Sequence, residues 1–295
     1  MGFGNIAEYA NADDAGQCWF TQFRKAVTST ATITASYVDY TYFAGSPLAN
    51  FYASTPLESA YVDDSRGIYI PQTTQYLKNI SVMTAASSAT STTNQRQELM
   101  LCDYLMYYPF VDTDSTDQQD MTQAVTLPRY EGGYVMAIAQ AASSTIGQFT
   151  FSYTNQDGVP GRVSPNIFTQ IVAGGGQTVS ADISGGGFHP FLPLQAGDSS
   201  VKSIESVTFT AVGGGLMALV IVKPILTFLV AQECRRTTSG NLESYGSASS
   251  FDSVVHRAGA QEIRQGAILG LVSKGQAGSL ASSILVGTLE TLWST

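Results

Sequence analysis

Several segments alternate strictly between apolar and polar residues, which is the pattern of a strand that buries one face. In QFTFSYT, residues 148–154, the rings of Phe149, Phe151 and Tyr153 fall on one side and polar residues on the other. The segment SVTFTA, residues 206–211, repeats this pattern. A period of two predicts strands whose inner faces meet in a core.

Other strand candidates are apolar on both faces, as expected of strands packed between sheets or against a neighbouring subunit. They are LMLCDYLMYY (residues 99–108), YVMAIAQA (residues 134–141) and LMALVIV (residues 216–222). The longest apolar stretch, Leu216–Ala231, is too short for a membrane-spanning helix and carries Lys223 and Pro224 in its middle. We interpret it as two buried strands separated by the proline, and we expect no membrane contact.

Glycine triplets and prolines separate the strand candidates at short intervals. The triplets lie at residues 174–176, 185–187 and 213–215. Many short strands with such punctuation predict an all-β protein, an antiparallel β-sandwich of jelly-roll type. We expect one such domain over residues 28–295, with residues 251–295 as its C-terminal strands and residues 1–27 as an N-terminal arm.

Two short helices are predicted. Across Asp13–Val27, the side chains of Ala15, Trp19 and Phe23 fall on one helical face. The second segment, Asp114–Val125, opens with acidic residues, which a helix N-terminus favours.

Four aspartates lie close together in VDTDSTDQQD, at positions 112, 114, 117 and 120. A calcium-binding loop would add a glycine at the bend and a closing glutamate, and both are missing. A helix with acids in its first turns explains the spacing better, with an adventitious divalent ion as the alternative. No metal site is expected.

The residues that would support catalysis are few. Only His189 and His256 could act as a histidine base, and no serine lies in a GxSxG turn. The cysteines Cys18, Cys102 and Cys234 lack metal-ligand spacing, so we expect buried thiols and synthesis in a reducing cytoplasm. No glycine triplet continues into a phosphate-binding loop. We therefore expect no catalytic residue, no cofactor and no enzymatic activity.

The charge balance excludes one class of partner. The 295-residue chain has 23 acidic and 14 basic residues, a net charge of −9, whereas a general nucleic-acid binder needs a basic face. Charged residues make up only 13% of the chain, so hydroxyl and backbone groups must cover much of its surface. Such a surface is typical of binding modules and of subunits within assemblies.

The segment YTNQDGVPGRVSP, residues 153–165, contains turn residues that could also form a binding loop. Asp157 and Gly158 are a strong hairpin signal, and Pro160-Gly161 supplies a second bend. Turn formation explains every residue except Arg162. Its guanidinium is expected to pair with a carboxylate on a neighbouring strand or subunit, which makes it a candidate interface residue.

Four segments resemble a family of tailed-bacteriophage virion proteins, capsid decoration (cement) proteins built on jelly-roll-like sandwiches. They are residues 47–57, 101–130, 153–165 and 190–209. The resemblance implies a structural protein without enzymatic activity that is assembled in the host cytoplasm and binds the outer capsid surface. Its partners would be the major capsid protein and copies of itself, with a homotrimer as the expected state.

Two other functions remain open at this point. A tail or fibre component with a carbohydrate-binding sandwich would expose aromatic side chains in a groove. An enzyme that cuts polysaccharide would need two carboxylates across a cleft.

The aromatic residues of the N-terminal arm have two possible roles. Trp19 and Phe23 are the expected anchors if residues 1–27 dock on a neighbouring subunit or on the capsid shell. The alternative is that they cover the edge of their own sandwich.

Overall fold

The fold is almost entirely antiparallel β-structure. The computed structural model describes residues 3, 5–27, 37–71, 73–86, 96–179, 190–231, 234–236, 242–244, 247–252, 261–275 and 283–294. Every pair of named strands in these ranges is antiparallel. The all-β sandwich predicted from alternation is therefore confirmed.

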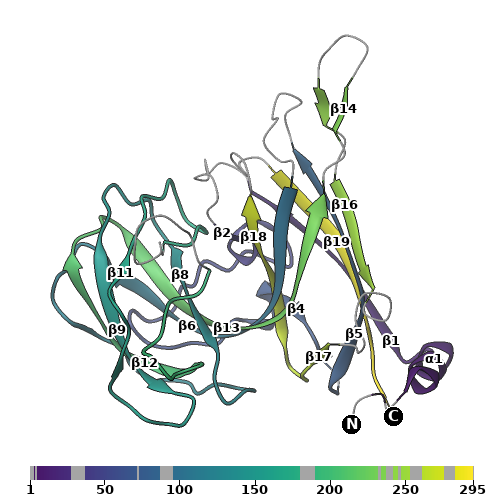
Figure 1. The fold of residues 1–295 in the computed structure, drawn as a ribbon, viewed down its shortest axis with the longest axis horizontal. Coiled ribbons are helices and arrows are strands. Elements are labelled where there is room, and N and C mark those ends of the chain that lie inside the picture. Colours follow the sequence, from purple (N-terminus) through teal and green to yellow (C-terminus); the bar gives the residue numbers. More distant parts are fainter. Residues whose placement is uncertain are drawn as a thin grey trace.

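A central sheet runs through the whole molecule (Figure 1). Its order is β2-β18-β6-β13-β8, with β4 paired to β18. The strands are β2 (Tyr37–Asp39), β4 (Ile68–Tyr69), β6 (Arg96–Asp112), β8 (Tyr134–Ala139), β13 (Leu216–Ala231) and β18 (Ile268–Gly275). At 17 and 16 residues, β6 and β13 are the longest strands and extend into both lobes.

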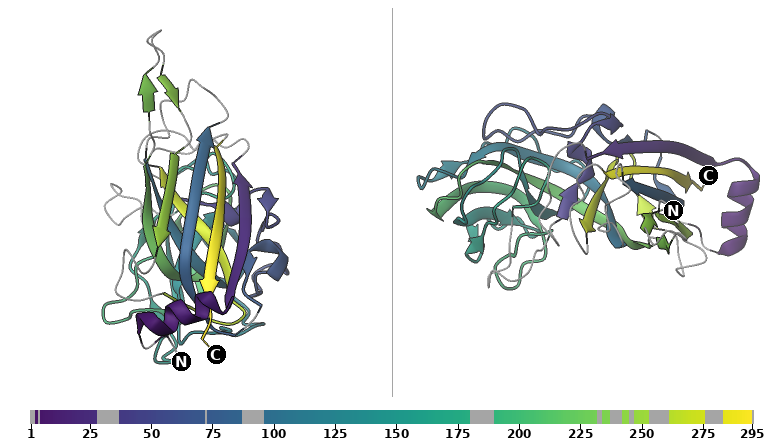
Figure 2. Two further views of the ribbon diagram at one scale, coloured as in Figure 1. Left: turned by 90° about the vertical axis from the view of Figure 1, so that its right-hand side faces the viewer. Right: turned by 90° about the horizontal axis from the view of Figure 1, so that it is seen from above.

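Two further sheets pack against opposite ends of this central sheet. One has the order β16-β5-β19-β1-β3, which Figure 2 shows face-on in its left view, and β17 pairs with β5. Its strands are β1 (Cys18–Ala26), β3 (Gly45–Ser46), β5 (Gln75–Ala86), β16 (Ser247–Asp252), β17 (Glu262–Ile263) and β19 (Ser283–Leu292). We call this half the β5 lobe.

The other sheet has the order β10-β9-β12-β7, with β11 paired to β9, and forms what we call the β9 lobe. Its strands are β7 (Gln119–Asp120), β9 (Gln148–Asn155), β10 (Arg162–Val163), β11 (Ile167–Phe168) and β12 (Val201–Ala211). A separate ribbon pairs β14 (Cys234–Arg236) with β15 (Leu242–Ser244).

The alternation of side chains along β6 explains how one sheet serves two lobes. Leu99 and Leu101 face the core of the β5 lobe, and Leu105, on the same side, faces the core of the β9 lobe. Met100 and Tyr104 point the other way, into a third cluster. That cluster is covered by the segment that contains the 3₁₀ helices η1 (Tyr40–Tyr42) and η2 (Asp64–Arg66).

The apolar stretch around Pro224 is one strand, so the expectation of two strands is wrong. Residues of β13 pair with β6 from Leu216 to Ala231, and the register shifts between Pro224 and Leu226. A proline cannot donate a ladder hydrogen bond, and a bulge is a position where that loss is tolerated. The strand therefore continues past its proline.

The helix predicted over Asp13–Val27 is wrong. The helix α1 is Ile6–Asp14, and the chain then turns through Gly16, whose φ is 69°, into β1. Strand β1 pairs with β19 over its whole length, so the expected arm does not continue past this turn. None of the described helices has the length and hydropathy of a membrane span.

The helix predicted over Asp114–Val125 is also wrong. The Asp112 side chain accepts a hydrogen bond from the Asp114 N–H at 2.8 Å, which favours a turn over a helix. The Gln119 side chain bonds both backbone groups of Asp112 across this turn. The chain then forms the short strand β7, which pairs with β12.

We expect core truncation in the β9 lobe to be costly. Phe151 is fully buried between β9 and the central sheet, so Phe151→Ala should lower the free energy of unfolding by about 3–5 kcal/mol. Val163→Ala, at an exposed position in the same lobe, should change it by less than about 0.5 kcal/mol. Urea denaturation followed by fluorescence measures both, and equal effects would contradict this placement of the core.

Candidate functional site

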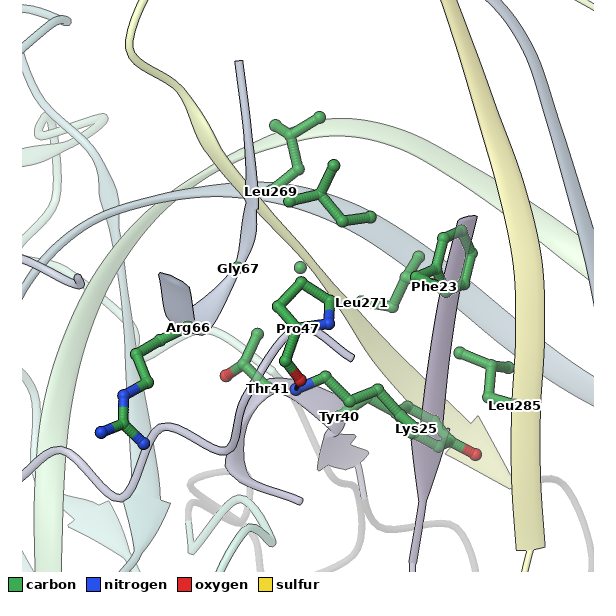
Figure 3. A pocket seen from close by; sticks show the side chains of 12 residues that line it. Phe23, Lys25, Tyr40, Thr41, Pro47, Arg66, Gly67, Leu269, Leu271 and Leu285 are labelled. Atoms are coloured by element: carbon green, nitrogen blue, oxygen red, sulfur yellow. Dashed lines mark hydrogen bonds between the residues drawn. The ribbon is translucent and has the colours of Figure 1, made fainter. Parts of the chain in front are cut away.

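A buried lysine occupies the gap between β1 and the central sheet, where Figure 3 shows a pocket. Lys25 points inward from β1, and its ammonium donates to the carbonyl oxygens of Phe43 (3.3 Å), Pro47 (2.7 Å) and Leu48 (3.0 Å). These carbonyls belong to the segment between the 3₁₀ helices, which closes the side of the β5 lobe. The lysine thus ties this segment to β1.

The surroundings of Lys25 are mainly apolar. Phe23, Leu271 and Leu285 line the same pocket. Burial lowers the pKa of Lys25 to about 8, the carboxyl of Asp39 opposes this shift, and Arg66 adds to it. A buried amine with a lowered pKa resembles a nucleophilic lysine, but the three donors of this ammonium are already engaged by carbonyls. The contacts favour a structural role.

Asp39 forms a second buried centre on the other face of the central sheet. Its Oδ1 accepts hydrogen bonds from the Thr41 N–H (2.8 Å), the Thr41 hydroxyl (2.7 Å) and the Tyr104 hydroxyl (2.7 Å). Its Oδ2 accepts one from the Tyr52 hydroxyl. Burial raises the pKa of Asp39, and these hydrogen bonds oppose the rise. The network thus fastens the segment that contains η1 and η2, called the covering segment below, to β6.

The third centre is an ion pair where the two lobes meet. Asp103 lies between Leu101 and Leu105 on the face of β6 that both cores share, and its side chain is fully buried. Arg129 donates to it in bidentate fashion, from Nη2 to Oδ1 at 2.5 Å and from Nε to Oδ2 at 2.8 Å. Burial raises the pKa of Asp103, whereas Arg129 lowers it.

Further contacts fix this ion pair between distant parts of the chain. Arg129 also donates to the Gly266 carbonyl at 2.6 Å, and Asp103 accepts from the Ile268 N–H at 3.1 Å. The Arg264 guanidinium stacks on Tyr130, 4.5 Å from the ring centroid. The buried charge therefore joins β6, β18 and the segment before β8.

The turn containing Arg162 is a hydrogen-bonded hairpin, as its sequence predicted. The Gly158 N–H donates to the Asn155 carbonyl at 3.0 Å, and Gly158 has a φ of 79°. Arg162 donates from Nε to Asp198 at 2.8 Å, which lowers the pKa of Asp198 to about 2. The expected carboxylate partner of Arg162 thus lies in its own chain.

A carboxylate on the outer face of the β9 lobe holds the same turn. Glu205 accepts hydrogen bonds from the Ser152 and Thr154 hydroxyls, each at 2.8 Å, and from the Gly161 N–H. Burial opposes ionisation of Glu205, but these hydrogen bonds outweigh it and lower its pKa. The carboxylate anchors β9 and the turn to β12.

The predicted interface residues lie apart from one another. Phe23 is buried in the core of its own lobe and Trp19 packs against that core, which favours the alternative that they cover their own sandwich. Arg162 lies in the other lobe. Cys102 is buried as expected, whereas Cys18 is exposed, which corrects the expectation of a buried thiol.

The other candidate residues do not converge on a site. Within the described ranges, no three His, Cys, Asp or Glu side chains are placed to hold a metal ion. The Asp112–Asp120 run is a turn and a short strand. His189 and His256 lie outside the described residues.

Sequence reasoning missed the buried charges. Lys25, Asp39, Asp103 and Arg129 were not identified, although a lone aspartate within LMLCDYLMYY was a usable signal. A charge inside a doubly apolar strand requires a partner. The sequence does not indicate that Arg129 supplies it.

A shallow groove lies between the 123–131 segment, the start of β12 and the β17–β18 turn. Arg264, Lys202 and Tyr130 are among its lining residues. Lys202 is 3.8 Å from Glu131 at the rim, which is a weak exposed pair. Among the described residues that line the groove, Tyr130 is the one aromatic residue, and the Arg264 guanidinium lies over its ring.

No protein-family model matches the chain, and no curated protein matches it in sequence. Among solved structures, it is similar to the D431N mutant VP2 protein of infectious bursal disease virus in derived T=1 particles. The identity is 7%, the coverage 93% of this chain and 77% of that chain, and the TM-score 0.21. VP2 of the Gx strain gives 8% identity, 94% and 81% coverage, and a TM-score of 0.18. Scores this low do not establish a shared fold.

Breaking the Asp103–Arg129 pair should destabilise the protein strongly. Arg129→Met leaves a buried carboxylate without its cation, so it should lower the free energy of unfolding by about 3–5 kcal/mol. Adding Asp103→Leu should recover most of this loss, because both charges are then gone. The control Arg264→Met, at a more exposed site, should cost about 1 kcal/mol or less. A loss no larger than the control's in urea denaturation would refute the role of the pair.

Lys25 should make stability depend on alkaline pH. Its folded pKa of about 8 lies below the ordinary value of 10.5, so the unfolded chain binds more protons between these values. The free energy of unfolding should therefore rise by about 2 kcal/mol between about pH 7 and about pH 9.5. Lys25→Met should remove this rise. Lys78→Met should keep it, because a salt bridge to Asp13 raises the pKa of Lys78 above its ordinary value.

Proposed function

We propose that this chain is a virion structural protein that binds the outer surface of a capsid and reinforces it, a capsid decoration protein without enzymatic activity. Its partner is then the major capsid protein, and its location is the capsid exterior. The sequence resemblance to decoration proteins motivates the proposal. Two features of the structure support it: the buried charged groups bond within their own chain, and uncharged polar and apolar groups lie on the surface of the β9 lobe.

The supporting observation is that the buried charged groups form their hydrogen bonds and ion pairs within the fold. Lys25, Asp39 and the Asp103–Arg129 pair each bond other parts of their own chain. These contacts stiffen the covering segment and the junction between the lobes. Such a scaffold suits adhesion through preformed surfaces, since little ordering cost is added on binding.

The outer surface of the β9 lobe is suited to a broad protein contact. Along β9 and β12, the hydroxyl side chains of Thr150, Ser206 and Thr208 face outward, beside the Glu205 carboxylate that the Ser152 and Thr154 hydroxyls bond. Such uncharged hydrogen-bonding groups resemble the polar part of a protein–protein interface.

Exposed apolar side chains gather at one end of the same lobe. Ile146, Ile171 and Val212 are each more than two-fifths exposed. Their loops meet, because the Thr145 N–H donates to the Gly213 carbonyl and the Thr169 N–H donates to the Gly147 carbonyl. We assign this end to the shell contact, since apolar groups rimmed by polar residues favour association.

A tail or fibre component that binds carbohydrate is the second candidate expected from the sequence. It calls for aromatic rings exposed in a groove. Among the described residues, the groove at Tyr130 offers one ring, which Arg264 covers, and this observation favours the capsid decoration function.

Binding to capsids tests the proposal. The purified chain should co-sediment saturably with particles assembled without it and raise the temperature at which they release DNA. Ile146→Asp should weaken this binding at least about tenfold, the effect of about 1.4 kcal/mol at an apolar contact. Met83→Asp, at an exposed position on β5 in the other lobe, should leave it unchanged.

Three outcomes would count against the proposal. Binding to isolated tails but not to heads would favour the second candidate. Binding to host polysaccharide would point the same way. Release of reducing sugar from that polysaccharide would overturn the absence of activity.

A further inference from the structure

Strand β1 leaves part of a sheet edge open. It lies beside β19 on one side, and on the other side β3 pairs only with Arg24 and Lys25. Among the described residues, no strand pairs with Cys18–Phe23 on that second side. Helix α1 does not cover this edge, because it packs toward β19 and β5, as the Asp13–Lys78 salt bridge and the left view of Figure 2 show.

The hydrogen-bond pattern identifies which backbone groups face the open side. The Ala26 N–H donates to the Ala44 carbonyl on the β3 side. The β1–β19 register runs without interruption, so the residues two, four and more positions away point the same way. The N–H and C=O groups of Cys18, Phe20 and Gln22 therefore face outward.

This edge lacks the usual protection against pairing. Natural edge strands carry charges, prolines or bulges that discourage another strand from adding to them. The segment CWFTQF, residues 18–23, has none of these. Phe20 is 53% exposed on the outer face of the sheet. An apolar, uncharged edge of this kind is a template for strand addition.

We propose that two copies of this chain pair through β1, edge to edge and antiparallel, so that two sheets join into one. In the register that uses all the outward groups, Phe20 lies opposite Phe20 of the second copy. Cys18 of each copy then lies opposite Gln22 of the other copy. The two phenylalanine rings become cross-strand neighbours on one face, which stabilises such a pair.

The surrounding chain leaves room for this register. Gly16 of the second copy comes opposite Arg24, where β3 already occupies the edge. The chain leaves the strand direction at Gly16, because its φ of 69° turns it toward α1. The open length between the Gly16 turn and β3 thus matches the length that the pairing needs.

The edge on β1 is one place where charge does not oppose a second copy as the occupant. The chain has a net charge of −9, so two copies repel one another over most of their surfaces. Residues 17–23 carry no charge, so pairing this edge with itself brings no like charges together. A twofold contact uses one edge from each copy and closes, so it does not propagate into fibres. The inference does not rest on capsid binding, and a pair differs from the trimer expected from the sequence.

Molar mass in solution is the first test. Light scattering after size exclusion should give two chains for the wild type. Gln22→Pro should give one chain, because it removes an outward donor and blocks pairing while keeping the β1–β19 bonds. The control Met83→Lys changes an exposed apolar residue two strands away and should remain a pair.

A covalent trap tests the register without weakening the fold. Under mild oxidation, Gln22→Cys should form a disulfide between its new thiol and Cys18 of the second copy, identified by peptide mapping. Thr288→Cys, beside Gln22 on β19, should not form this bridge. Amide exchange in the wild type adds a third readout. The N–H groups of Phe20 and Gln22 should lose protection on dilution, whereas that of Thr21 should not.

A wild-type mass of one chain or of three chains would overturn the pairing. So would a Gln22→Pro variant that remains a pair. If that variant does not fold, the decision passes to the oxidised Gln22→Cys protein, in which a missing bridge to Cys18 refutes the proposed register.

Discussion

The pairing of β6 with β13 is the interaction on which the rest of the structure depends. Each lobe has an outer sheet of its own, but both rely on these two strands for the opposite wall of their cores. Leu101 and Phe228 face the core of the β5 lobe, and Val111 and Leu219 face that of the β9 lobe. The third cluster, on the reverse face, needs the same strands. The fold is therefore two sandwiches built on one shared layer.

At the centre of the shared layer, between the two lobes, neither outer sheet covers β6, so other groups must fill that space. On the face that the two lobes share, a charged pair lies there between their apolar cores. Asp103 is opposite Lys223 in the β6–β13 register, and Arg129 reaches it from a loop. A buried ion pair often adds little net stability, but its bidentate geometry constrains how its two partners are placed. Its role here is to fix how the segment before β8 and the β17–β18 turn meet β6.

The sequence predicted the strands whose inner faces are uniformly apolar. Phe149, Phe151 and Tyr153 alternate without exception, and β9 follows this alternation. The sequence pattern did not predict the strand β1. Its inward positions include the polar residues Thr21 and Lys25, so the apolar residues do not alternate there with a period of two. Apolar residues at helical spacing were coincidental in that segment.

The candidate site was harder to predict than the strands for a physical reason. Lys25 can be buried because carbonyl oxygens of a distant segment accept hydrogen bonds from its ammonium, and backbone acceptors leave no mark in a sequence. Likewise, Arg129 and Asp103 are 26 positions apart, and nothing local pairs them. The hairpin before Arg162 was predictable because its turn residues are adjacent in the chain.

The shared strand pair also determines how the molecule responds to mechanical force. Ladder hydrogen bonds lie perpendicular to their strands. Because β6 and β13 each run unbroken through both lobes, tension along the length of the molecule is carried by two continuous backbones, and it does not peel the ladder bonds between them apart one after another. The strongest direction of the molecule is therefore along the length of these two strands, from the β5 lobe to the β9 lobe.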